Sequence, residues 1–110
     1  MARFITFFSY SGDATKALIE RPSDRSAAAK ALVESIGGTQ EAFYWMQGKH
    51  DGFLITNLPD GVAASALAAA VGASGAVVNA QTHQIFDGDE QAAIVKQAAA
   101  ALRAYKPPTA

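Results

Sequence analysis

Few residues of this chain could do chemistry, and two of them follow one short turn. His50 and Asp51 come directly after Gln47-Gly48-Lys49, between two apolar runs. A histidine can carry a proton near neutral pH, and a carboxylate at the mouth of a pocket can act as a general base. The structural alternatives are a solvated loop histidine and an aspartate whose side chain accepts backbone N–H groups in the turn. We favour the structural alternative for both residues.

The turn itself predicts how its flanking strands pair. Glycine at the first central position of a two-residue loop suits a type II′ hairpin, which needs a positive φ there. With Gly48-Lys49 as the loop, Trp45 pairs with Gly52, and the indole is expected to cover the bare backbone of that glycine. Successive strand residues point to opposite faces, so His50 and Asp51 are not expected to act together as a dyad.

Hydrophobic patterning predicts a βαββαβ order with one further helix. Strands are expected over 3–10, 39–47, 51–58 and 76–86, and helices over 23–36, 60–71 and 87–105, with a short helical turn over 13–20. Ser23 or Asp24 is the expected N-cap of the first long helix, and Asp87 and Glu90 have capping-box spacing. The alanine runs 27–29 and 98–101 predict close helix packing.

Two β-α-β halves of this length imply an α+β fold with a four-stranded antiparallel sheet in the order 4-1-3-2 and helices on one face. Both faces of that sheet are apolar. Phe4, Phe8 and Tyr10 point one way, whereas Ile5 and Phe7 point the other. The last helix could cover part of the second face, but the sheet of a second copy is the more economical cover. We therefore expect a face-to-face homodimer that closes an α/β barrel.

The strand directions bring several polar residues to one end of the sheet. Strand one ends there, and strands three and four begin there. The candidate ligand pocket consists of five residues: Tyr10, Trp45, His50, Asp51 and Asn79. Apolar walls with a few polar groups are the usual form of a small-molecule site. Aromatic side chains on strands, however, more often belong to the plain core.

Composition excludes several classes of function. Half of the 110 residues are apolar, 17% are charged and the net charge is −1, so no basic surface is predicted for nucleic acid or an anionic membrane. There is no cysteine, and His50 and His83 are the only histidines, which is too few ligands for a protein metal site. No cofactor is expected. Haem bound by one histidine stays open as an alternative, since related barrel folds can hold it, but nothing in the sequence specifies it.

The chain is expected to form a single domain over 1–105, followed by a tail over 106–110. Residues 61–86 carry no charge, but glycines and polar side chains interrupt the stretch, so it does not predict a membrane span. The N-terminus leads directly into a strand pattern and has no signal-peptide hydrophobic region. We expect a cytoplasmic protein.

The order of several short motifs resembles the GYD domain family. The matching features are a first strand that ends in Tyr10, Pro22-x-x-Arg25, Gly37-Gly38, Phe43-Tyr44, Gly48-Lys49-His50-Asp51, Leu58-Pro59-Asp60, an alanine-rich helix, and Gly75 before a strand that contains Thr82. The resemblance implies a ferredoxin-like fold of the dimeric α/β-barrel type in a small bacterial protein. It does not imply a reaction. The sequence departs from the family's Gly-x-Tyr-Asp, because His50 stands in place of the tyrosine.

Three functions remain open at this point. One is an oligomeric protein that binds a small organic molecule between sheet and helices. Another is a cofactor-independent enzyme of the oxygenase or isomerase kind, and the third is a purely structural or regulatory oligomer. A fold of this class hosts unrelated activities and does not choose among them. A deep pocket that reaches Asp51 or His50 would favour the first two, and a filled core would favour the third.

Overall fold

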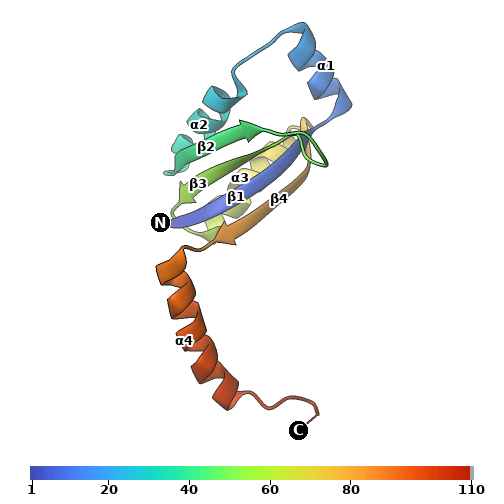
Figure 1. The fold of residues 1–110 in the computed structure, drawn as a ribbon. Helices are drawn as coiled ribbons and strands as arrows, with labels where there is room; N and C mark the ends of the chain where they lie inside the picture. The colour runs from blue at the N-terminus through green and yellow to red at the C-terminus, as the bar shows by residue number, and fades with distance from the viewer. Residues whose placement is uncertain (110) are drawn as a thin grey trace.

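The computed structural model describes residues 1–109, and their order of elements is the predicted one. The elements are β1 (Ala2–Tyr10), α1 (Gly12–Glu20), α2 (Arg25–Ser35), β2 (Thr39–Trp45), β3 (Gly52–Leu58), α3 (Gly61–Ala73), β4 (Val77–Ile85) and α4 (Gly88–Ala104). Figure 1 shows α2 and α3 on one side of the sheet and α1 at its upper end.

The four strands form one antiparallel sheet in the order β2-β3-β1-β4. This confirms the predicted order, which is the same arrangement counted from the other edge. With two helices on one face, the chain has the ferredoxin-like α+β fold. Neighbouring strands that run antiparallel place the end of β1 next to the starts of β3 and β4, at one end of the sheet.

The core lies between the sheet and the two helices that cover it. Its buried residues come from the helix-facing positions of β1 and β3 and from the two helices: Phe4, Phe8, Val33, Leu54, Leu58 and Ala64. Alternation along the strands explains this set, because residues two apart share a face. The opposite positions of β1, such as Ile5 and Phe7, face away from the helices and are partly exposed.

The connection between β2 and β3 differs from the predicted two-residue turn. The predicted pairing of Trp45 with Gly52 is confirmed. Both strands stop there, however, so the connection runs from Met46 to Asp51. The Met46 backbone N–H donates to the Asp51 carbonyl at 2.8 Å, but the Asp51 N–H donates to the Phe8 carbonyl of β1, also at 2.8 Å. The two-residue turn is wrong because Asp51 uses its N–H to pair with β1.

The side chain that covers Gly52 is also different from the predicted one. A Cβ added at Gly52 would lie 2.7 Å from Cζ of Phe8 and 2.6 Å from the carbonyl oxygen of Tyr44. The Phe8 ring therefore covers the glycine, and the predicted cover by Trp45 is wrong. The indole remains 52% exposed.

Side-chain caps define where the helices begin. Asp24 caps α2 by accepting from the Ala27 N–H, which decides between the two predicted caps. Asp87 and Glu90 form the predicted capping box at the start of α4. The short helical turn predicted over 13–20 is a complete helix of nine residues, α1, because the Ser11 side chain caps it.

Helix α4 extends away from the rest of the chain (Figure 1). Every residue from Gly88 to Ala104 is exposed. The radius of gyration is 17.7 Å, whereas a compact domain of this size has a radius of about 13 Å. In the single chain this helix therefore does not cover the second sheet face, which was the less favoured of the two covers considered from the sequence.

Candidate functional site

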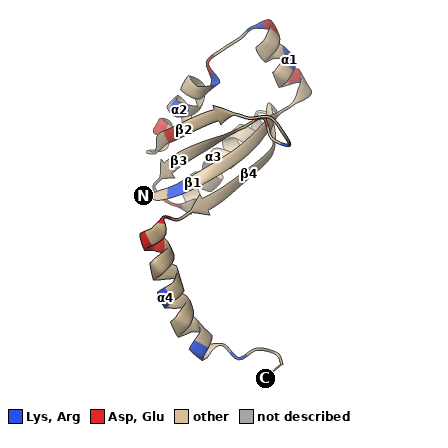
Figure 2. Cartoon of the chain, in the orientation of Figure 1, with Lys and Arg blue, Asp and Glu red and all other residues tan. Residues whose placement is uncertain are grey.

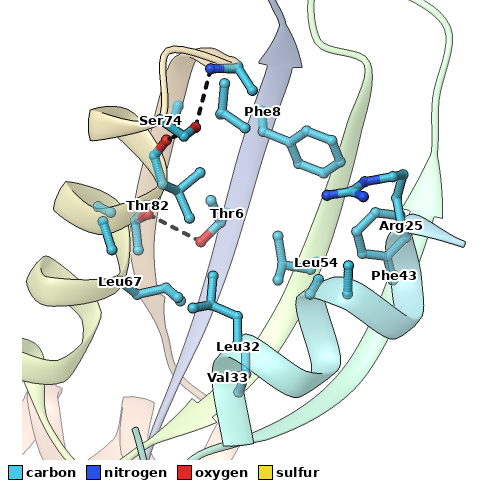
Figure 3. A pocket seen from close by; sticks show the side chains of 18 of the residues that line it. Thr6, Phe8, Arg25, Leu32, Val33, Phe43, Leu54, Leu67, Ser74 and Thr82 are labelled. Carbon is cyan, nitrogen blue, oxygen red and sulfur yellow. Dashed lines mark hydrogen bonds between the residues drawn. The ribbon is translucent and has the colours of Figure 1, made fainter. Parts of the chain in front are cut away.

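An open cleft lies between α2 and α3, above the middle of the sheet. Helix α2 packs on β2, and α3 packs mainly on β4 at the opposite edge. The spread of the helices leaves a cavity of about 310 Å³ over the two central strands. Figure 3 shows the two helices on either side of this cleft, with their side chains directed into it.

The walls of the cleft are almost entirely apolar. Leu32 of α2 and Leu67 of α3 face each other across it, above Phe8 and Leu54 on the floor (Figure 3). Small residues line both helices where longer side chains would fill the space: Ala28, Ala29, Ala68 and Ala70. The alanines at 28 and 29 thus leave room between the helices, and the prediction that their run marks only close helix packing is wrong.

The polar groups of the cleft are few. The hydroxyl oxygens of Thr6 and Thr82 lie 3.1 Å apart, on β1 and β4 (Figure 3). One hydroxyl hydrogen makes this bond, and the second hydroxyl hydrogen is available to another acceptor. Arg25, the first residue of α2, lies at one end of the cleft and donates to the Ser23 hydroxyl at 3.3 Å.

Of the five predicted site residues, Tyr10 lines the cleft and Trp45 lies beside it. The Tyr10 ring is 5.4 Å from the Phe8 ring and 5.7 Å from the Trp45 ring, between centroids. Trp45 supports the Tyr10 ring without belonging to the lining. These aromatic residues build one end of the cleft.

Asp51 has a structural contact at the same end of the sheet. Its Oδ2 accepts a hydrogen bond from the backbone N–H of Tyr10 at 2.8 Å. The carboxylate therefore holds the end of the β2–β3 connection against β1. It accepts a backbone N–H, as the structural interpretation expected, but from the neighbouring strand rather than from the turn.

His50 lies on the other face of the sheet. Its ring is 5.7 Å from the Phe7 ring, and the residue is only 8% exposed. The solvated-loop interpretation is wrong because the residue is buried beside the Phe7 ring. Its Nδ1 is buried and has no hydrogen-bond partner within the described chain.

Asn79, the last of the five predicted site residues, is exposed. It has a φ of 52° and lies at the bulge where β4 passes Phe8.

The available donors do not form a metal site. Within residues 1–109, no three His, Asp or Glu side chains lie close enough together to hold a metal ion. Neither histidine lines the cleft, so the cleft offers no imidazole to a haem iron.

Among residues 1–109, no helix is long and apolar enough to cross a membrane.

The sheet face opposite the helices is an apolar surface, which we call the open face. It is formed by Ile5, Phe7, Tyr44, Phe53 and Ile55, all partly or fully exposed. The rings of Tyr44 and Phe53 stack with centroids 5.6 Å apart. Figure 2 shows that the strands carry little charge.

One ion pair borders the open face. Arg3 and Glu41 approach to 3.0 Å, and Asn57 donates to the same carboxylate. The hydrogen bond from Asn57 and the nearby Arg3 guanidinium lower the pKa of Glu41. The carboxylate is therefore ionised at neutral pH, and the charged groups of this sheet face stay at its rim.

Comparison with known proteins identifies the family of the chain. The fold and the cleft define a small ferredoxin-like α+β protein with an open cleft between α2 and α3. The sequence model of the GYD domain matches residues 4–95, and the chain therefore belongs to the GYD domain family. This confirms the family resemblance, and His50 remains a departure from the tyrosine of its motif. No curated protein sequence matches the chain.

The chain also has a distant likeness to one solved structure. It is described as the crystal structure of the MhuD R26S mutant with two manganese protoporphyrin IX bound per active site. The likeness has 18% identity and a TM-score of 0.43, and it covers 80% of this chain and 95% of that chain. At this TM-score no conclusion about the chain is drawn from the likeness.

Proposed function

We propose that the protein binds a small, largely apolar organic molecule in the cleft between α2 and α3. The observation that carries the proposal is the cavity of about 310 Å³ above Phe8 and Leu54, which no core side chain fills. Its size is within the range of about 300–1,000 Å³ found for small-molecule pockets. A protein without a ligand there would gain stability by closing the helices over this apolar floor.

Binding without a chemical step fits the lining better than catalysis does. A general base must reach the proton that it removes. His50 is on the opposite face, and the Asp51 carboxylate is engaged by the Tyr10 backbone outside the lining. The guanidinium of Arg25 offers only N–H donors. The enzymatic alternative, a cofactor-independent oxygenase or isomerase, therefore has no carboxylate or imidazole base in the cleft.

The proposed form of the protein is a homodimer through the open face. Two apolar features of the single chain support it. The open face has no cover, and α4 exposes Ile94, Leu102 and Tyr105. Most of the stability of a helix in a protein comes from tertiary packing of its apolar face, so α4 is expected to pack on another surface. A second copy supplies cover for both features.

A neutral fluorescent probe tests the binding proposal. N-phenyl-1-naphthylamine should bind the protein with a rise in fluorescence. Ala28→Trp places an indole in the cleft from an exposed lining position. It should weaken binding by about tenfold or more, which corresponds to a loss of about 1.4 kcal/mol.

The matched control is Ala27→Trp, on the same helix but outside the lining. This variant should bind the probe as the parent protein does. Equal loss in both variants, or no binding by the parent protein, would overturn the proposal and favour the structural oligomer.

A further inference from the structure

A second cavity adjoins the cleft at the end where Tyr10 lies. It has a volume of about 370 Å³ and is lined by residues of α1, the α1–α2 connection and the start of α2. Tyr10, Arg25 and Ala76 line both cavities. A ligand longer than the cleft can therefore extend past Tyr10 into this second space.

The second cavity differs from the cleft in charge. Arg21 and Arg25 both line it, and neither cavity is lined by an aspartate or glutamate. The ion pairs found among residues 1–109 are Arg3–Glu41, Lys16–Glu20 and Lys30–Glu34. Both guanidinium groups of the cavity therefore lack an acidic partner in this part of the chain.

The positive charge around the second cavity is a local feature, because the chain as a whole is not basic. The net charge of the chain is −1. Arg25 is half-buried, and the one hydrogen bond found for it in the described chain goes to the Ser23 hydroxyl at 3.3 Å. A guanidinium presents five N–H donors in a planar fork that matches an anionic oxygen pair. Most of the donor capacity of Arg25 is thus left for a ligand.

We infer that the ligand is an amphipathic organic acid. This inference rests on the proposed function. The apolar body lies in the cleft between Leu32 and Leu67, and the anionic head lies in the second cavity against Arg25 and Arg21. The opposite orientation would place a charge among apolar side chains without a partner, at a large desolvation cost. The arginines therefore set both the class of the ligand and its direction.

Octanoate and octanamide test the inference, because they share the apolar chain and differ in charge. Isothermal titration calorimetry on the full-length protein at low salt should show octanoate binding about tenfold more tightly than octanamide, as expected for one charge-assisted pair. Arg25→Met retains the apolar stem and should remove most of this preference. Arg25→Lys should retain part of it. Added sodium chloride should narrow it.

Arg103→Met is the charge-matched control, since Arg103 is exposed on the projecting α4. This variant should keep the full preference. Equal affinities of octanoate and octanamide for the parent protein would overturn the inference and leave the proposed function standing. Failure of octanamide and the neutral naphthylamine probe to bind would overturn both. Persistence of the preference in the double variant Arg21→Met/Arg25→Met would place the head elsewhere and overturn the inference alone.

Discussion

The Asp51 carboxylate accepts a hydrogen bond from the Tyr10 backbone N–H at 2.8 Å, across 41 positions of the chain. The backbone N–H of Asp51 also donates to the Phe8 carbonyl. One residue outside the cleft thus fixes the backbone positions of two residues that line it. Asp51 is a positioning residue for the cleft, and its removal should be felt first in stability.

Asp51→Ala is expected to lower the free energy of unfolding by about 1–2 kcal/mol, because it leaves the Tyr10 N–H without its acceptor. Asp51→Asn keeps an acceptor oxygen and should cost less. Urea titration followed by circular dichroism measures both changes.

Asp89→Ala is the control, since Asp89 is an exposed carboxylate on α4. Its effect should be smaller, about 0.3–1 kcal/mol, because this exposed carboxylate lies in the first turn of α4. Unchanged or increased stability of Asp51→Ala would contradict the anchoring role. The carboxylate would then be a group retained for function at a cost in stability, and the enzymatic alternative would gain support.

Gly52→Ala should be more damaging than its size suggests. The added methyl group would lie 2.6 Å from the Tyr44 carbonyl oxygen, which is backbone and cannot easily move. We expect a loss of about 2–3 kcal/mol, in the range of overpacked cores. Gly61→Ala is the comparison, because nothing lies within 4 Å of its added Cβ. Urea titration measures the free energy of unfolding of both variants. If Gly52→Ala loses no more of it than Gly61→Ala does, the sheet relaxes around the added methyl group and the prediction is wrong.

His50→Tyr, a change toward the motif of the family, should leave stability within about 1 kcal/mol or raise it. The substitution removes the buried Nδ1 that has no partner, and such a group costs about 1–3 kcal/mol. The larger ring can remain against Phe7, on the open face. Differential scanning calorimetry of this variant and of His83→Tyr, an exposed histidine on the same face, measures the effect. A markedly lower melting temperature for His50→Tyr alone would mean that the imidazole makes a contact that tyrosine cannot replace.

Local patterns in the sequence were sufficient to predict the strands, their order, the capping box of α4 and, to within one residue, the cap of α2. Two-residue periodicity identified the two faces of β1, and the register of Trp45 with Gly52 followed from the turn. The exact hairpin connection did not follow, because the N–H of Asp51 pairs with β1 rather than within the hairpin. This hydrogen bond depends on β1, a strand about 40 residues away in the sequence, so the residues around the turn do not predict it.

The candidate site was predicted less well, for a similar reason. The spacing between α2 and α3 decides whether a cleft exists, and helix spacing is a tertiary property. The alanines at positions 28 and 29 were a usable signal, since small residues on a helix face over a sheet leave space as well as allow close packing. His50 was misplaced because its cover comes from Phe7 on another strand. The sequence allowed the last helix to cover part of the second sheet face, but in the single chain α4 projects away from the sheet.

Association through the open face is expected to make the protein at least a dimer. Light scattering coupled to gel filtration at micromolar concentration should give a mass of twice 11.4 kDa or more. Tyr44→Glu places a charge on this face at a residue that is 60% exposed in the single chain, so it should produce folded monomers. Val62→Glu, at an exposed residue of α3, should not change the mass. A parent protein that elutes as a monomer would contradict the dimer.

Methyl NMR tests the binding cleft most directly, because it reports where a neutral ligand lies. Octanamide titrated into protein labelled at Ile, Leu and Val methyl groups should shift the signals of Leu32, Leu67 and Val71, which line the cleft. The signals of Ile5 and Ile55, on the open face, should stay in place. Shifts confined to Ile5 and Ile55, or no shifts at saturating octanamide, would contradict the central claim that the cleft between α2 and α3 is a ligand site.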